Sequence, residues 1–411
     1  MNARLFVLTA FATSAILTTA SRAQEWTRFR GPNGSGLAQA PKLPATFGEQ
    51  DFNWKIELPG GGNSSPSIWG ERVFITANPA GTGRTVLLCV NAADGKVLWQ
   101  REHETNTFRK HADNSHATAT PAVDAERVYL LCLAPEGSVL VAFAQKDGSE
   151  VWRKDLGPFN SQHGPGTSPI VEDGMVIVDF DPDEPQSFVA AFDAATGAER
   201  WRWEHAGKKH TSSTPCLFRT KSGVTQVVTM SKNAGLTGLD FKTGQVAWQL
   251  PDLIAKRCVA SPLVADDLVF AQCGEGQAES FVYAVRPAAD GKSAQKVYEV
   301  IRTGGYVPTP IAVGPLLFLW KENGLVTCLR AANNEQIWSE RVQGPFYGSP
   351  IAVDGRLYSF TRRGELVVLH AGDKFQELAR IPLGEGSFAS PAVSGGRMYL
   401  RTFTHLISVG K

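Results

Sequence analysis

Short apolar segments separated by polar turns recur along this chain, and each cycle begins with a small hydroxyl residue followed by proline. The eight pairs are Ser65-Pro66, Thr120-Pro121, Ser168-Pro169, Thr214-Pro215, Ser261-Pro262, Thr309-Pro310, Ser349-Pro350 and Ser390-Pro391. Most pairs are followed by two apolar strands around a turn rich in Asp and Gly, then a third apolar strand, a polar turn and a tryptophan. Four short strands per repeat are typical of a β-propeller blade, and no helical period competes with them.

The two ends of the chain complete each other. The eighth unit stops at Lys411 after three predicted strands, at 392–393, 398–400 and 406–409. Residues 53–58 look like an outer strand, with its tryptophan at Trp54, but no repeat precedes them. Pairing this strand with the last unit would remove two exposed sheet edges. The sequence therefore predicts an all-β, eight-bladed β-propeller with four antiparallel strands per blade, closed by the N-terminal strand joining the last blade.

The tryptophans at the outer strands, such as Trp99, Trp152, Trp201 and Trp248, are expected to pack over the neighbouring blade. In the fifth repeat Tyr298 stands in the tryptophan position.

The first residues have the layout of a secretory signal peptide. A basic start at 1–4 precedes a mostly apolar run at 5–20, and Ser21 and Ala23 place small residues before a cleavage point. An N-terminal membrane anchor is the alternative, but this run is short for a membrane span. No cysteine lies near the cleavage point, which argues against a lipoprotein. We expect a signal peptide at 1–23 and a soluble, exported protein of the periplasm or cell envelope.

The mature chain is expected to consist of a lead segment at 24–52 and the propeller at 53–411. Two aromatic residues in the lead, Trp26 and Phe29, are expected to pack on the propeller, with Arg28 and Arg30 at the surface.

Charge and cysteine content narrow the range of partners. The chain has 41 Lys and Arg against 40 Asp and Glu, so nothing indicates a nucleic-acid partner. Of six cysteines, Cys258 and Cys273 flank a predicted hairpin and are a disulfide candidate, which the sequence alone leaves open. No CxxC or zinc spacing is present.

The turns of the form Asp-x-x-Thr-Gly-x-x-x-Trp at 193–201 and 240–248, with the Ser-Pro strand starts, resemble PQQ-like (pyrroloquinoline-quinone-type) repeats. Quinoprotein dehydrogenases and the outer-membrane assembly factor BamB share these repeats. The segments 26–36 and 156–164 further resemble exported, uncharacterised PQQ-like propellers of planctomycete-type bacteria. The resemblance implies the fold, but such a scaffold hosts unrelated functions.

Residues just before each inner strand of a propeller gather around one funnel, where functional groups concentrate. These candidate ligand-binding residues are Asn63, His116, His163, His210, Arg257, Tyr306, Tyr347 and Phe388.

An acidic loop of the third repeat should open on the same face. Its carboxylates Asp179, Asp181 and Asp183, with His163, are candidate ligands for calcium or a transition metal. The alternative is a solvated acidic loop beside histidines bonded to the backbone, and this alternative is favoured.

Three functions remain open. The favoured one is a non-enzymatic binding or assembly scaffold, BamB-like in fold, that presents its loop face and funnel to an envelope protein or ligand. A PQQ-dependent dehydrogenase, with PQQ and calcium as cofactors, is the enzymatic alternative, although the adjacent cysteine pair and long insertions of such alcohol dehydrogenases are absent. A carbohydrate-binding module is the third, because Tyr306, Tyr347 and Phe388 could stack on the sugar rings of a polysaccharide.

Overall fold

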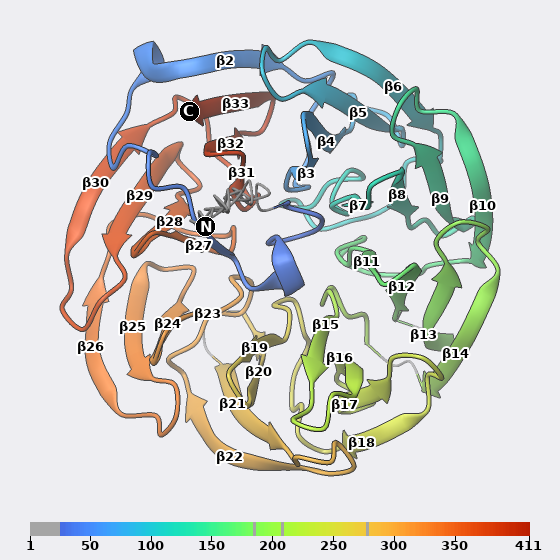
Figure 1. The fold of residues 1–411 in the computed structure, drawn as a ribbon, viewed down its shortest axis with the longest axis vertical. Coiled ribbons are helices and arrows are strands. Elements are labelled where there is room, and N and C mark those ends of the chain that lie inside the picture. Colours follow the sequence, from blue (N-terminus) through green and yellow to red (C-terminus); the bar gives the residue numbers. More distant parts are fainter. Residues whose placement is uncertain (1–24, 184–185, 207–208, 277–278) are drawn as a thin grey trace, which may run out of the picture.

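Eight blades, each with four antiparallel strands, stand around a central axis in this computed structural model, which describes residues 25–183, 186–206, 209–276 and 279–411 (Figure 1). Blade 1 holds β3 (Ser67–Trp69), β4 (Arg72–Ala77), β5 (Thr85–Asn91) and β6 (Val97–His103). Blade 2 holds β7 (Ala122–Val123), β8 (Arg127–Cys132), β9 (Ser138–Ala144) and β10 (Glu150–Gly157). Blade 3 holds β11 (Ile170–Glu172), β12 (Met175–Phe180), β13 (Gln186–Asp193) and β14 (Glu199–Ala206). Blade 4 holds β15 (Cys216–Arg219), β16 (Thr225–Ser231), β17 (Gly235–Asp240) and β18 (Val246–Leu250).

The remaining blades include the one that closes the ring. Blade 5 holds β19 (Leu263–Ala265), β20 (Leu268–Glu275), β21 (Glu279–Pro287) and β22 (Ala294–Ile301). Blade 6 holds β23 (Ile311–Val313), β24 (Leu316–Trp320), β25 (Leu325–Arg330) and β26 (Gln336–Arg341). Blade 7 holds β27 (Ile351–Val353), β28 (Arg356–Phe360), β29 (Glu365–His370) and β30 (Glu377–Pro382). Blade 8 joins β31 (Ala392–Ser394), β32 (Arg397–Arg401) and β33 (His405–Gly410) to β2 (Phe52–Glu57).

The predicted closure of the ring is confirmed. Strand β2 pairs antiparallel with β33, placing Trp54 opposite Ser408 (Figure 1). The two ends of the chain thereby complete one sheet. Strand β2 takes the outer position of blade 8 and covers the edge that β33 would otherwise expose.

Most outer-strand tryptophans join one blade to the next, as predicted. The indole N–H of Trp99 donates to the carbonyl of Gln145 in blade 2 at 2.9 Å, and Trp152 donates to the carbonyl of Ala194 in blade 3 at 2.9 Å. In blade 5, Tyr298 makes the equivalent contact, because its hydroxyl donates to the carbonyl of Ala331 in blade 6 at 2.6 Å. Trp248 differs, because its N–H reaches the side chain of Gln226 within its own blade.

The hydroxyl residues of the Ser/Thr-Pro pairs form a circle of hydrogen bonds around the axis. The backbone N–H of each hydroxyl residue donates to the side-chain oxygen of its counterpart in the next blade, over distances of 2.9 to 3.1 Å. The donors are Ser65, Thr120, Ser168, Thr214, Ser261, Thr309 and Ser390. In the described structure the eighth link is missing, since the Ser390 hydroxyl has no partner. The hydroxyl at this position accepts a buried backbone N–H group that is not paired with a neighbouring strand. This explains why Ser or Thr recurs in the repeat.

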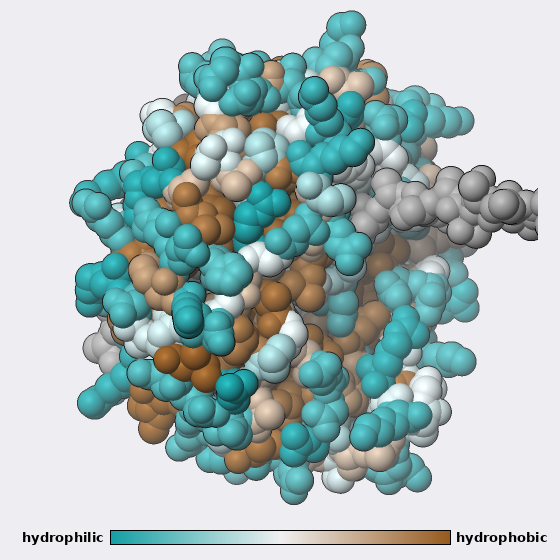
Figure 2. Space-filling view, turned by 60° about the vertical axis from the view of Figure 1, so that its left-hand side comes forward, coloured by the Kyte–Doolittle hydropathy of each residue, from teal (hydrophilic) through white to brown (hydrophobic). Residues whose placement is uncertain are grey.

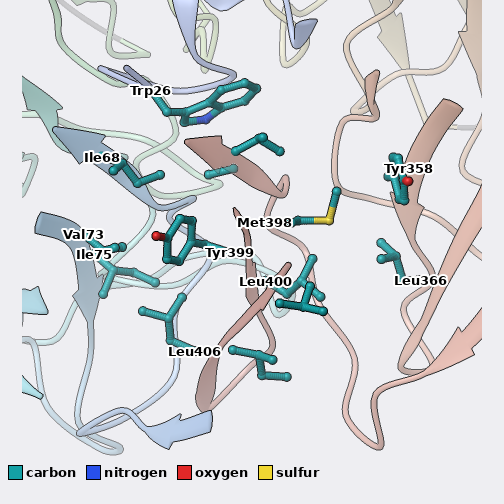
Figure 3. Close-up of a cluster of buried hydrophobic side chains, with 14 of the residues drawn as sticks. Trp26, Ile68, Val73, Ile75, Tyr358, Leu366, Met398, Tyr399, Leu400 and Leu406 are labelled. Atoms are coloured by element: carbon teal, nitrogen blue, oxygen red, sulfur yellow. The ribbon is translucent and has the colours of Figure 1, made fainter. Parts of the chain in front are cut away.

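The largest hydrophobic cluster lies where the two ends of the chain meet. Trp26 of the lead packs with Ile68 of blade 1, Tyr358 of blade 7, and Met398 and Tyr399 of blade 8 (Figure 3). The core therefore joins the first and last blades directly, through side chains as well as through the shared sheet.

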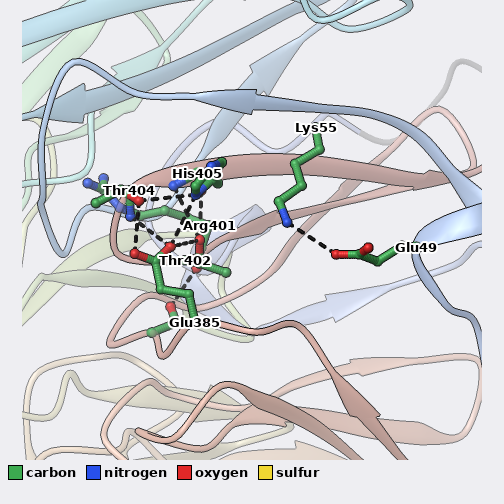
Figure 4. Close-up of polar contacts among 8 residues, drawn as sticks. Glu49, Lys55, Glu385, Arg401, Thr402, Thr404 and His405 are labelled. Atoms are coloured by element: carbon green, nitrogen blue, oxygen red, sulfur yellow. Dashed lines mark hydrogen bonds and ion pairs between the residues drawn. The ribbon is translucent and has the colours of Figure 1, made fainter.

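Polar contacts reinforce the same junction. The buried Arg401 donates from Nη1 to the carbonyls of Thr76 in blade 1 and of Ser64 in the loop before it, at 2.6 and 3.2 Å. Beside it, the Glu385 carboxylate accepts hydrogen bonds from the hydroxyls of Thr402 and Thr404, which fixes the β32–β33 turn (Figure 4).

The lead segment plugs the central channel from one side. The segment contains a short helix, η1 (Pro32–Gly34). Before this helix, Trp26 forms an antiparallel β-bridge with Ile68. After it, β1 (Leu37–Ala38) pairs in parallel with β27, the inner strand of blade 7. A second short helix, η2 (Glu49–Asp51), leads into β2. Figure 1 shows this segment crossing the middle of the ring.

The expectation that Arg28 and Arg30 lie at the surface is wrong. Arg28 is 3% exposed and Arg30 is fully buried, and Nη2 of Arg30 donates to the carbonyls of Pro310 and Pro350 at 2.9 and 3.2 Å. Burial lowers the pKa of Arg28 to about 10 and that of Arg30 to about 9. The guanidinium of Arg30 thus ties blades 6 and 7 to the plug.

The pair that the sequence left open as a disulfide candidate is unbridged in this structure. Cys258 and Cys273 are buried free thiols that pack in the core between blades 4 and 5. Their segments do face each other, since Arg257 and Gly274 form an antiparallel bridge directly beside them.

Hydrophilic side chains project from the outer surface, with hydrophobic ones in the recesses between them (Figure 2). No helix among the described residues has the length and apolar character needed to cross a membrane. The predicted signal peptide at 1–23 lies outside the described residues.

Candidate functional site

A cavity of about 630 Å³ opens on the axis of the propeller. Its floor consists of Phe29 from the plug and of the hydroxyl circle described above, seven members of which line it. These are Thr120, Ser168, Thr214, Ser261, Thr309, Ser349 and Ser390. The plug therefore turns a central channel into a blind funnel. Its volume lies within the usual range of small-molecule sites, about 300–1,000 Å³.

The structure brings most of the predicted ligand-binding residues together in this funnel. Those that line it are Asn63, His163, His210, Arg257, Tyr306, Tyr347 and Phe388. His116 does not line it. Its ring packs edge-on against Phe108, with the ring centroids 4.4 Å apart. An inner strand begins four to seven residues after each lining position, which explains why one position in most repeats converges on the axis.

One wall is polar and carries a guanidinium at its centre. Nη1 of Arg257 lies 2.9 Å from both ring nitrogens of His163. The ring of His163 stacks on that of His111, with an angle of 9° between the planes. Burial and then the charge of Arg257 lower the pKa of His163. A neutral imidazole can therefore accept the hydrogen bond that Arg257 donates.

A long loop at 104–121 folds over this wall, and the sequence reading did not identify its residues as part of the site. His111 donates its backbone N–H to the carbonyl of His163 at 3.1 Å. The side-chain amide of Asn114 donates to the carbonyls of His163 and Pro165, at 2.7 and 2.8 Å. A usable signal existed, because Pro66 and Pro121 are the most widely spaced of the successive repeat prolines, 55 residues apart.

The opposite wall is aromatic and is crossed by a salt bridge. The rings of Tyr347 and Phe388 lie 4.8 Å apart, and Arg362 lies 5.1 and 5.0 Å from their centroids. Nη2 of Arg362 also pairs with Asp113 of the long loop at 2.6 Å. Arg362 comes from the β28–β29 turn, so the pair joins blade 7 to the loop before blade 2 across the funnel mouth.

Glu322 holds the remaining aromatic residue in place. Its Oε1 accepts the backbone N–H groups of Tyr306 and Val307, at 2.7 and 2.6 Å. The carboxylate is buried, and its Oε2 has no partner in the described structure. Burial raises the pKa of Tyr306, so its hydroxyl stays protonated and can donate.

His210 is enclosed by its own loop, which precedes blade 4, and by the β12–β13 loop of blade 3. Its Nδ1 lies 3.2 Å from the carbonyl of Asp181 and its Nε2 lies 2.8 Å from the Ser212 hydroxyl. Burial lowers its pKa to about 4. His210 is therefore neutral at pH 7, with both ring nitrogens already engaged.

The predicted metal ligands are not brought together. The Asp183 carboxylate accepts the backbone N–H groups of Gln162 and His210, while Asp179 and Asp181 are buried and accept hydrogen bonds from Thr229 and Ser187. His163 faces Arg257 rather than these carboxylates. Among the described residues no three His, Cys, Asp or Glu side chains are placed to share a metal. The acidic run is therefore not a solvated loop: two of its carboxylates are buried, and its acceptors bind donors from neighbouring loops and from β16 of blade 4.

Burial has a strong effect on two of these carboxyl groups. It raises the pKa of Asp181 to about 6, and burial together with the charge of Asp181 raises the pKa of Asp179 well above its ordinary value. For Asp183 burial acts in the same direction, but the hydrogen bonds from His210 and Gln162 outweigh it and lower the pKa.

With this geometry in place, the comparisons with known proteins assign the chain to a family. The family described as "Outer membrane protein assembly factor BamB" matches residues 83–340 and 278–402. The chain belongs to this family. Two BamB proteins are similar in sequence, one from Moranella endobia (strain PCIT), 25% identical over 232 residues, and one from Yersinia pestis, 24% identical over 233 residues. Each match covers 52% of this chain and 56% of the relative, so the chain spans about half the length of the curated relatives it matches.

Solved structures share the fold across nearly the whole chain. Quinohemoprotein alcohol dehydrogenase from Comamonas testosteroni has a TM-score of 0.70 at 13% identity, and the match covers 96% of this chain and 81% of the enzyme. BamB from Moraxella catarrhalis has a TM-score of 0.60 at 15% identity, covering 87% of this chain and 97% of that one. At these identities the likeness concerns the fold, which an enzyme and an assembly factor share.

Among the described residues, the carboxylates of the funnel are not arranged to hold the calcium-type ion of a quinoprotein dehydrogenase. Three carboxylates line the funnel, and each has other partners. Asp113 pairs with Arg362, Glu275 pairs with Lys256 at 3.3 Å, and Glu322 binds two backbone N–H groups. None of the three is grouped with further ligands for a hard cation, which needs six to eight oxygens.

Proposed function

We propose that this BamB-type propeller is a non-enzymatic binding module of the cell envelope that recognises its ligand or partner through the funnel. The observation that carries the proposal is the arrangement of Arg257, which has no carboxylate partner among the described residues, beside three half-buried aromatic rings in a blind cavity. Loops on a rigid β-scaffold are where binding residues concentrate.

The histidines support recognition rather than acid–base chemistry. Both ring nitrogens of His210 are engaged, and its pKa of about 4 leaves it neutral at pH 7. His163 is held between Arg257 and the ring of His111. A general base needs a pKa near the working pH and a free nitrogen, and neither histidine offers both.

The family supports a role in the envelope. Its description names an outer-membrane assembly factor, and the predicted signal peptide would export the chain. The same loops that form the funnel mouth, including 104–121, would also present a surface to an envelope protein.

Affinity purification of the mature chain from its host envelope, followed by native mass spectrometry, tests this proposal. We expect the wild-type protein to carry a small-molecule adduct or an envelope protein, and Arg257→Gln to lose it. Arg200→Gln, an exposed site on β14 paired with Asp193, is the matched control and should retain it. Equal retention by the folded Arg257→Gln variant would contradict recognition through the funnel.

A further inference from the structure

We propose that the funnel binds an acidic sugar, with its carboxylate against Arg257 and its ring against the aromatic wall. This inference rests on the proposed function and specifies the ligand. Three independent features of the funnel carry it, namely the unpaired guanidinium, the aromatic arc and the hydroxyl floor.

Arg257 is a half-buried cation in the wall of the funnel. Among the described residues no carboxylate oxygen lies within 4 Å of it, whereas Arg362 pairs with Asp113 at 2.6 Å. Its Nη1 is bonded to the neutral ring of His163, and its Nε is buried without a partner. A half-buried guanidinium with an unsatisfied donor is a costly arrangement unless an acceptor arrives. A carboxylate supplies acceptor oxygens and charge together, in the geometry that a guanidinium binds best.

The aromatic arc faces the same space. Tyr306, Tyr347 and Phe388 come from three consecutive blades, line the cavity and are only half buried. Tyr306 adjoins Arg257, because its ring packs against Gly274, the residue bridged to Arg257. Half-exposed rings in a concave site gain free energy when an apolar face covers them. The C–H face of a pyranose ring is such a surface, and it leaves the sugar hydroxyls pointing sideways.

The floor favours a ligand rich in oxygen atoms. The hydroxyls of Thr120, Ser168, Thr214 and the equivalent residues accept backbone N–H groups, so their own hydrogens remain to be donated. Gln162 adds a side-chain amide at the wall. A flat aromatic acid would supply a carboxylate to Arg257 but no acceptors for the floor hydroxyls and the wall amide. A sugar acid supplies a carboxylate to Arg257 and hydroxyl oxygens to these donors.

Isothermal titration of the mature protein tests the inference with matched ligands. The probes are trimers of galacturonate, mannuronate and guluronate, each compared with its methyl ester, which keeps the ring and removes the charge. We expect at least one trimer to bind about 10- to 100-fold more tightly than its ester, as charge-assisted hydrogen bonds require. Arg257→Gln should equalise acid and ester, and Arg257→Lys should keep part of the preference.

Aromatic variants separate the two halves of the ligand. Tyr306→Ala should weaken acid and ester about equally, because both keep the sugar ring, and Tyr306→Phe should bind nearly as the wild type does. Equal binding of every acid and its ester by the wild type would overturn the inference, and so would no binding of any trimer. The proposed function would survive that result if the envelope-purified protein still carried an Arg257-dependent adduct or partner.

Discussion

Nη1 of Arg257 lies 2.9 Å from the ring nitrogens of His163, although 94 positions separate the two residues in the chain. The contact spans from the loop before blade 5 to the loop before blade 3, over the inner end of blade 4. It places a cation against a neutral imidazole at the centre of the polar wall.

Removing this cation should make His163 easier to protonate. Burial and the charge of Arg257 both lower the pKa of His163, so in Arg257→Gln the imidazole should titrate at a higher pH than in the wild type. NMR titration of labelled histidines measures the midpoint. His103 is the internal control, because its pKa is lowered by burial and by Arg153 rather than by Arg257. An unchanged His163 midpoint would show that the two groups do not interact in solution.

The hydroxyl circle makes a prediction that contrasts two of its members. Thr214→Val removes the acceptor for the backbone N–H of Ser168 and leaves that buried donor unsatisfied, which should lower the free energy of unfolding by about 1–3 kcal/mol. Ser390→Ala should cost much less, because the Ser390 hydroxyl has no partner in the described structure. Urea denaturation of both variants, with Thr214→Ser as the conservative control, measures the difference. Equal losses for Thr214→Val and Ser390→Ala would refute the role of the circle.

The plug should contribute measurably to stability. Arg30→Ala removes the hydrogen bonds to the carbonyls of Pro310 and Pro350 and leaves a cavity beside Gly36, so we expect a loss of about 2–4 kcal/mol. The exposed Arg200 is the control, and its replacement by alanine should change the free energy of unfolding by less than about 0.5 kcal/mol. If both variants unfold at the same urea concentration as the wild type, the lead is not docked in the channel.

The buried carboxyl of Asp181 predicts an unusual dependence of stability on pH. Its folded pKa of about 6 lies above the ordinary value of 3.8, so the folded protein binds more protons between these values and the contribution of Asp181 to stability falls as pH rises through that window. His210 acts in the opposite sense, since its folded pKa of about 4 makes its contribution rise with pH up to about 6.5.

Replacing Asp181 by asparagine should therefore remove the contribution of Asp181 that falls with pH. Asp181→Asn should be more stable than the wild type at pH 7, by about 3 kcal/mol at most from 1.36 kcal/mol per pKa unit, and should show little advantage at pH 4. Urea denaturation at the two pH values measures this, with the exposed Asp252→Asn as control. An advantage that is the same at both pH values would contradict the raised pKa.

The architecture could be predicted from sequence because each repeat carries its own signals. The Ser/Thr-Pro pairs mark the starts of the inner strands. The strand containing Trp54 has no repeat of its own, so it can only complete the last blade, where Trp54 pairs with Ser408 in β33. The position before each inner strand also predicts the funnel, since propeller geometry alone brings those residues to the axis.

What could not be predicted depends on loops and on burial. Arg28 and Arg30 look like surface residues, because charge is normally solvated, and nothing local indicates that the lead enters the channel. Arg362 and Asp113 meet across the funnel mouth from turns whose path the repeat pattern does not specify. The acidic residues at 179–183 have the composition of a metal site, but their carboxylates accept hydrogen bonds from neighbouring hydroxyl and backbone N–H groups.

The central claim is that this BamB-type propeller binds through its funnel. A crystal structure of the mature protein, purified from its host envelope without added ligand, tests it most directly. The account predicts density for a bound group in the funnel, in contact with Arg257 and the ring of Tyr306. A ligand or partner chain bound only at the outer strands, with water alone beside Arg257, would contradict it.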